Sequence, residues 1–196
     1  GRFLLANAAW EGAFAGARTF VVLYVTVGLG QPLSTSTLVL AAVAGGYVIA
    51  ALVAGSVGDR FGLARVITWC SLVYGIGLLG GGLATEWHAW YLAVIFVVAI
   101  FAGAVMTLAW GLLFKLMPSE DRGAIAGLAT TTKGIGLIVG TLLAGILIDV
   151  LQPYLPETDG YQVLWPILAV PILLAVPLVA PLVGPEETAA EFTAGS

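Results

Sequence analysis

Six long apolar runs, separated by short polar connections, organise this chain of 196 residues. They cover about residues 3–29, 35–57, 64–83, 90–114, 123–150 and 161–184. Each run suits an α-helix that crosses a bilayer, which needs roughly 20 predominantly apolar residues. The alternating ten-residue segments of a membrane β-barrel are absent. The pattern therefore predicts an all-α membrane protein with six transmembrane helices.

Composition agrees with this interpretation, because 60% of the residues are hydrophobic and only 9% are charged. A soluble domain carries about 25% charged residues. The single cysteine, Cys70, lies inside an apolar run, so it cannot form an intrachain disulfide and we expect it to be a packing residue. A soluble fold is excluded on these grounds.

Orientation follows from the basic residues, which collect on one side of the predicted membrane. They lie at the amino end and in the connections after the second and fourth runs: Arg2, Arg60, Arg65, Lys115 and Arg122. The other connections contain no Lys or Arg, and their charged residues are acidic apart from His88. By the positive-inside rule we expect a multi-pass protein of the plasma membrane with both termini in the cytoplasm. Residues 1–184 are then a transmembrane bundle, and residues 185–196 are an acidic cytoplasmic tail.

Two ionisable residues lie deep within apolar runs. Glu11 lies roughly 12 Å beyond the start of the first run, and Lys133 lies about 15 Å beyond the start of the fifth. A charge at membrane depth is costly, so it is rare, faces a protein interior or a cavity, and marks a functional hypothesis. Opposite charges at similar depth indicate a transport site.

Both charged positions share a helix face with distinctive neighbours. On a helical wheel Asn7, Glu11 and Arg18 fall within about 40° of one another and form a polar stripe on the first run. Arg18 faces either a substrate or the outer membrane interface, which its side chain could reach by snorkelling. Lys133 shares its face with small residues, which are expected where two helix backbones touch: Ala126, Ala129, Gly136, Gly140 and Ala144.

The connection after the second run carries the most specific motif, with Gly55, Asp59, Arg60, Gly62 and Arg65 in the spacing G-x-x-x-D-R-x-G-x-x-R. A tight turn between antiparallel helices needs glycine where helices touch or φ becomes positive. The Asp59 carboxylate can face the amino end of a neighbouring helix. An ordinary basic cytoplasmic turn explains the same residues equally well.

This motif resembles the signature loop of the major facilitator superfamily, which joins the second and third helices of a six-helix half. The resemblance implies half of a major facilitator fold, with two inverted three-helix repeats. It favours the carboxy-terminal half, because the fourth run has no membrane arginine and the stretch from Met117 to Gly123 resembles the connection before the eleventh helix. The runs would then be helices seven to twelve, and an amino-terminal half would be missing.

The resemblance also implies a site. The seventh and eleventh helices of the superfamily are neighbours, so we expect Glu11 and Lys133 to form a salt bridge. An assembly pair without a transport role is the alternative. The tenth helix lines the central cavity, so Thr107 and Trp110 of the fourth run are candidate substrate contacts, although core packing explains them equally well. The hydroxyls of Thr130, Thr131 and Thr132 are expected to bond to carbonyls of their own helix.

We therefore predict one half of a secondary active transporter, which moves a small solute by alternating access with possible coupling to protons. Expected partners are a small-molecule substrate, protons, the lipid bilayer and the missing half, but no nucleic acid. Asp59 would meet that half and steady the outward-open state. A non-transporting membrane scaffold or a half-size dimeric protein is the alternative.

An enzymatic function is not expected. The motif partly matches membrane enzymes that transfer phosphatidyl groups from cytidine-linked lipids, but no Asp or Glu lies between Arg65 and Glu86 to complete their metal site. Intramembrane serine proteolysis is disfavoured because the only histidine, His88, lies in a short connection. No P-loop occurs, and we expect neither a cofactor nor a bound metal.

Overall fold

Helices make up nearly all of the secondary structure in the computed structural model, which describes residues 1–117 and 122–184. The main helices are α1 (Arg2–Leu23), α2 (Leu33–Phe61), α3 (Leu63–Gly81), α4 (Tyr91–Leu116), α5 (Arg122–Leu151) and α6 (Leu164–Val179). A π-helix over Tyr24–Gly28 continues α1. Short 3-10 turns cover Gln152–Tyr154, Pro156–Thr158, Tyr161–Val163 and Ala180–Leu182. The predicted acidic tail, and residues 118–121 of the connection before α5, lie outside the described residues.

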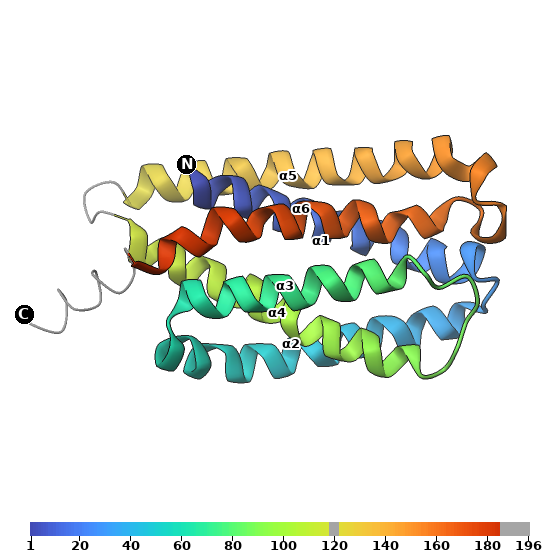
Figure 1. The fold of residues 1–196 in the computed structure, drawn as a ribbon, viewed down its shortest axis with the longest axis horizontal. Helices are drawn as coiled ribbons and strands as arrows, with labels where there is room; N and C mark the ends of the chain where they lie inside the picture. The colour runs from blue at the N-terminus through green and yellow to red at the C-terminus, as the bar shows by residue number, and fades with distance from the viewer. Residues whose placement is uncertain (118–121, 185–196) are drawn as a thin grey trace, which may run out of the picture.

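Within the described ranges, five helical segments are long and apolar enough to cross a membrane: those that contain α2, α3, α4, α5 and α6. The helix α1 has a comparable length of 22 residues, but Glu11 and Arg18 lower its hydropathy. It packs against both α5 and α6 and crosses behind α6 in the view of Figure 1. Glu11 is therefore buried within the bundle on a helix of spanning length, whereas Arg18 is exposed.

The helix contacts reveal an internal two-fold relation. The helix α1 packs against α5 and α6, while α4 packs against α2 and α3. The remaining large contact joins α3 to α6. Exchanging α1 with α4, α2 with α5 and α3 with α6 reproduces the same set of contacts. This is the pattern of two three-helix repeats, α1–α3 and α4–α6, as predicted.

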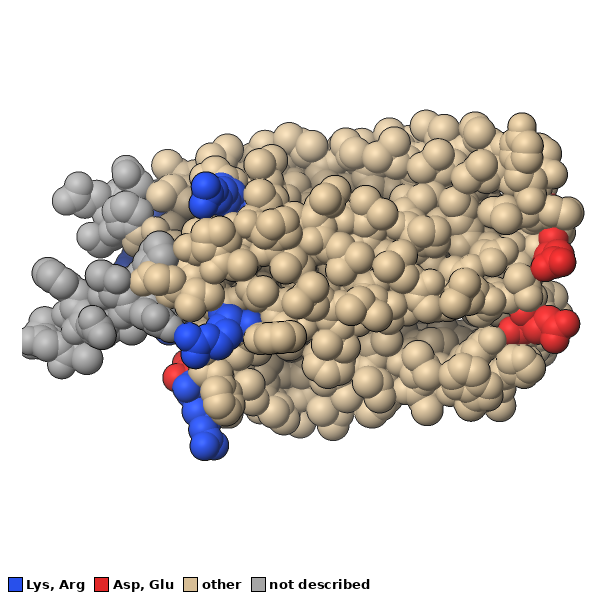
Figure 2. Space-filling view, viewed as in Figure 1, with Lys and Arg blue, Asp and Glu red and all other residues tan. Residues whose placement is uncertain are grey.

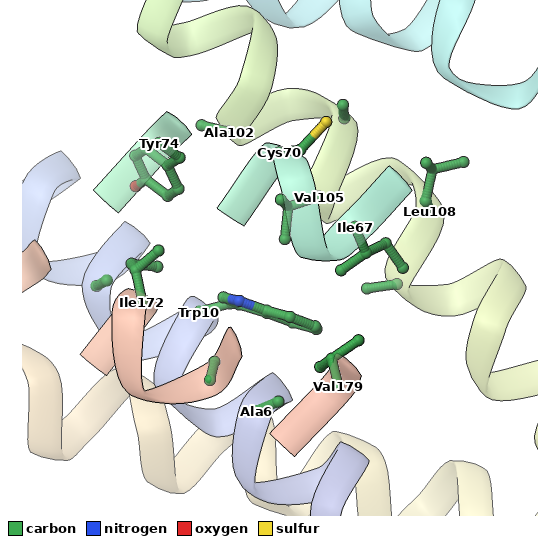
Figure 3. Packing of buried hydrophobic residues seen from close by; sticks show 14 of the residues in the cluster. Ala6, Trp10, Ile67, Cys70, Tyr74, Ala102, Val105, Leu108, Ile172 and Val179 are labelled. Atoms are coloured by element: carbon green, nitrogen blue, oxygen red, sulfur yellow. The ribbon is translucent and has the colours of Figure 1, made fainter. Parts of the chain in front are cut away.

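An aromatic residue of α1, Trp10, packs at the centre of the bundle. Trp10 is 1% exposed and lies among side chains of α3, α4 and α6, with Tyr74, Val105 and Ile172 around it (Figure 3). The Cys70 thiol is free and buried in the same cluster, which confirms its expected packing role. Burial of these apolar side chains packs α1 against helices of both repeats. Because Trp10 precedes Glu11 directly, this packing also fixes the position of Glu11.

The signature motif forms a much shorter connection than the apolar pattern predicts. The second run was expected to end near residue 57, but α2 continues to Phe61 and α3 begins at Leu63. Gly62 alone makes the turn, with a φ of 85° that L-residues rarely adopt. One residue suffices because glycine reverses the chain without steric cost. Asp59 and Arg60 therefore lie on the last turn of α2 and not in a loop.

Replacing Gly62 by alanine should lower the free energy of unfolding by about 1–3 kcal/mol, the usual cost of forcing a side chain into such a backbone conformation. Gly80→Ala is the matched control, because Gly80 is helical and has open space around its Cα. Alanine favours helix there, so stability should be unchanged or slightly higher. Thermal unfolding of the two purified variants measures the difference, and equal melting temperatures would contradict the prediction.

Charged residues are segregated along the bundle. Lys and Arg side chains gather at one end together with a small acidic patch, and the charged side chains at the opposite end are acidic (Figure 2). The N-terminus and the carboxy end of α6 both lie at the basic end (Figure 1). The flanks between the ends carry almost entirely uncharged side chains in this view, as expected of a surface that faces lipid.

Candidate functional site

The site begins with an unusually close crossing of α1 and α5. A Cβ placed on Gly12 would lie 2.8 Å from the Gly136 carbonyl oxygen. A Cβ on Gly136 would collide with the backbone of Ala8, and one on Gly140 with the backbone of Gly12. Only glycine permits this approach. The small residues predicted to share a face with Lys133 therefore do form the helix contact.

This crossing brings the two membrane charges together. The Lys133 ammonium lies 2.9 Å from Oε1 of Glu11, which confirms the predicted salt bridge. The Glu11 side chain is 8% exposed and that of Lys133 is 39% exposed. The carboxylate is thus held inside the bundle, while the ammonium also faces open space. Burying a carboxylate without a partner carries a large desolvation penalty. The Lys133 ammonium offsets part of this penalty, which allows Glu11 to be charged inside the bundle.

Asn7 fixes the register of the same two helices. Its side-chain amide donates a hydrogen bond of 3.4 Å to the carbonyl oxygen of Ala129, four residues before Lys133. Both groups are buried. Asn7 was predicted as a site residue because it shares a stripe with Glu11. The structure places it at the helix contact and not among the residues that line the cavity described next.

A cavity of about 520 Å³ opens beside the ion pair. Its charged lining residues are Glu11, Arg18 and Lys133. The remaining lining residues come from the same two helices: Phe14, Ala15, Thr19, Leu137 and Thr141. The ring of Phe14 also lies 5.7 Å from that of Tyr47 on α2. The volume is within the range of small-molecule sites, which is about 300–1,000 Å³.

Thr107 and Trp110 of α4 lie away from this cavity. Thr107 is exposed, and the ring of Trp110 is 6.2 Å from that of Phe114. Neither residue is among the lining residues of the cavity. Their proposed role as substrate contacts stays a prediction. The threonines of α5 behave as predicted, since Thr130, Thr131 and Thr132 each donate to a carbonyl oxygen three or four residues earlier.

None of the uncharged lining residues was predicted from the sequence. Phe14, Ala15 and Thr19 follow Glu11 on α1, and Leu137 and Thr141 follow Lys133 at intervals of four residues. Helical spacing from the two charged residues was a usable signal for this set. It went unused because phenylalanine, leucine and threonine are equally common on faces that contact lipid or core.

The motif residues lie together at the basic end of the bundle. Asp59 and Arg60 are exposed, and the Arg60 guanidinium lies 5.2 Å from the ring centre of Phe61. Arg65 is exposed in the first turn of α3. A Cβ on Gly55 would meet no atom within 4 Å in the described part of the chain, so Gly55 makes no close helix contact there.

A bundle of membrane-spanning helices in inverted repeats, with charges facing a cavity at membrane depth, defines a multi-pass membrane protein of transporter architecture. The sequence model of the Major Facilitator Superfamily matches residues 4–196. The chain therefore belongs to the Major Facilitator Superfamily, as its signature motif predicted.

Individual relatives match parts of the chain. An uncharacterized MFS-type transporter of Mycobacterium tuberculosis (strain CDC 1551 / Oshkosh) is 31% identical over 125 residues, which are 63% of this chain and 18% of that protein. The cis,cis-muconate transport protein of Acinetobacter baylyi is 29% identical over 131 residues, which are 67% of this chain and 30% of that protein. The curated relatives are thus much longer than the segments matched here.

A solved structure has the same fold. The in meso crystal structure of the POT family transporter PepTSo superposes with a TM-score of 0.68 at 20% identity, and the match covers 92% of this chain and 36% of that one. At this identity the likeness concerns the fold alone.

Proposed function

We propose that this chain is one six-helix half, the carboxy-terminal one, of a secondary active transporter that moves a small solute by alternating access. The observation that carries the proposal is the Glu11–Lys133 ion pair beside a cavity of about 520 Å³. Charges at this depth are retained where a solute or an ion passes. The inverted repeats supply the architecture in which two halves rock around a central site.

The missing half would close the other side of the cavity and meet the motif residues at the basic end. Asp59 and Arg60 are exposed there, which leaves them accessible to a second bundle. We place this end in the cytoplasm because the basic residues gather at it. Transport would therefore require the full-length protein, meaning both halves together.

The ion pair gives the transporter a means of responding to protons. Protonation of Glu11 would remove the charge that holds the Lys133 ammonium 2.9 Å away. Lys133 would then be free to turn toward the cavity, which its 39% exposure allows. The two protonation states would differ in the force between α1 and α5, so a proton could shift the balance between inward-open and outward-open states.

A Glu11→Gln variant should transport solute without moving protons. Glutamine keeps the size of the side chain but cannot take up a proton. Thermal-shift screening of metabolite and drug libraries first identifies a solute, and full-length protein in liposomes that contain a pH-sensitive dye then reports proton movement. Wild-type protein should acidify the lumen when solute is added outside, whereas Glu11→Gln should not.

Glu86→Gln is the matched control for this experiment, because Glu86 is an exposed residue in the connection between α3 and α4. It should retain the proton signal. Proton movement of normal size in the Glu11→Gln variant would remove the coupling role. Failure of the wild-type protein to accumulate any solute would instead favour a membrane scaffold.

A further inference from the structure

The charges in the cavity do not balance. Two cations, Arg18 and Lys133, line it together with one anion, Glu11. The anion is already committed to Lys133 at 2.9 Å. The lining groups therefore leave one positive charge without compensation, and that charge belongs to Arg18.

Arg18 has no partner within residues 1–117 and 122–184, where the structure gives it neither an ion pair nor a hydrogen bond. Glu11 lies seven residues earlier on the same helix, roughly 10 Å along its axis, and cannot serve both cations at once. The nearest carboxylate farther along α5 is Asp149, eight residues or roughly 12 Å beyond the lining residue Thr141.

The depth of Arg18 makes an uncompensated charge costly. It follows Arg2 by 16 residues and precedes Gly28 by ten, so its Cα lies roughly 24 Å from the basic end of the helix and roughly 15 Å from the other end. The side chain is exposed and lines the cavity. A guanidinium at such a depth requires a counter-ion. The cavity is the space from which one can come.

The other residues that line the cavity with Arg18 indicate what chemical groups a ligand would carry. Thr19 and Thr141 add hydroxyl groups to the cavity lining, and Phe14 and Leu137 add apolar surface to it. A guanidinium presents a planar fork of N–H donors that matches the two oxygens of a carboxylate. An anion with an apolar body would satisfy both parts of the lining.

We propose that the cavity binds a small organic carboxylate, with its carboxylate on Arg18 and its apolar body against Phe14 and Leu137. This inference rests on the proposed transport function and adds the chemical class of the solute. Ligand binding does not require the Glu11–Lys133 pair to break, because Arg18 supplies the uncompensated charge.

The experiment compares three matched panels of compounds on the purified full-length protein. The first panel holds monocarboxylates such as benzoate and hexanoate, the second holds their primary amides, and the third holds the corresponding amines. Binding is measured as thermal stabilisation and by calorimetry. Carboxylates should bind and the isosteric amides should not. Phenyl phosphate is added to separate carboxylate recognition from recognition of phosphate.

Variants of Arg18 identify the group responsible. Arg18→Gln should weaken carboxylate binding by about ten-fold or more, which corresponds to one lost charge-assisted contact. Arg18→Lys should recover part of the affinity, since it restores the charge without the fork. Arg2→Gln, outside the cavity at the exposed amino end, is the control and should bind as the wild-type protein does.

The outcomes separate the two proposals. Equal binding of amides or amines, binding of phenyl phosphate alone, or carboxylate binding that survives Arg18→Gln would overturn the carboxylate assignment and leave transport standing. Absence of binding and uptake for every panel would overturn both.

Discussion

Lys133→Met should destabilise the protein by about 3 kcal/mol and reduce solute uptake at least ten-fold. The variant leaves Glu11, which is 8% exposed, without the ammonium that now lies 2.9 Å from it. Removing one partner of a buried ion pair costs about 3–5 kcal/mol, because the remaining charge is desolvated without compensation. The lower end of this range applies here, since the Lys133 side chain is 39% exposed and partly screened by water.

The double variant Glu11→Gln with Lys133→Met tests whether the pair acts as a unit. It removes both charges, so it should recover most of the stability that Lys133→Met loses. Uptake driven by a proton gradient should stay low, because no titratable carboxylate remains at the crossing. Chemical unfolding and liposome uptake measure the two quantities separately. Stability losses that simply add in the double variant would show that the two side chains do not interact.

Gly136→Val should separate α1 from α5 and abolish the ion pair as a consequence. A side chain at this position would collide with the backbone of Ala8, which cannot move aside as a flexible side chain could. Overpacking of a tight contact costs about 1–3 kcal/mol and more where backbone must shift. Uptake should fall together with stability, because Glu11 and Lys133 depend on this crossing for their distance.

Gly134→Val is the control for the crossing, because it makes the same substitution two residues away on the same helix. A Cβ at Gly134 would meet no atom within 4 Å in the described part of the chain. Both variants carry the same intrinsic cost of valine in a helix, so the difference between their melting temperatures isolates the steric effect. Similar melting temperatures would argue against a tight α1–α5 contact in the membrane.

The sequence was informative about the fold for a specific reason. A bilayer demands long apolar runs and satisfied backbone groups, which leaves helices as the simple solution for this pattern. Glu11 and Lys133 were found because charges are so rare in such runs. Their contact could be predicted only with the neighbour relation that the signature motif implied. The distance of 2.9 Å then followed from glycines at the crossing.

Other features could not be predicted from one sequence. The wheel placed Asn7 and Arg18 on one stripe, but the stripe does not reveal that Asn7 bonds to Ala129 while Arg18 faces the cavity. Whether a residue of this stripe contacts α5 or lines the cavity depends on where along α1 the helix α5 packs, which one sequence does not show. The extension of α2 to Phe61 was also missed, because charged residues such as Asp59 and Arg60 end an apolar run without ending a helix.

The two-fold relation between the repeats pairs the α1–α5 crossing with the α2–α4 crossing, where Gly46 and Gly103 allow a similarly close approach. No charged residue occurs between Leu33 and Gly58 or between Tyr91 and Phe114. The α2–α4 crossing therefore contains no pair of charged residues comparable to Glu11 and Lys133. If Glu11 takes up a proton as proposed, the α1–α5 crossing loses its ion pair while the α2–α4 crossing has none to lose, so the two symmetry-related crossings would respond differently to acid.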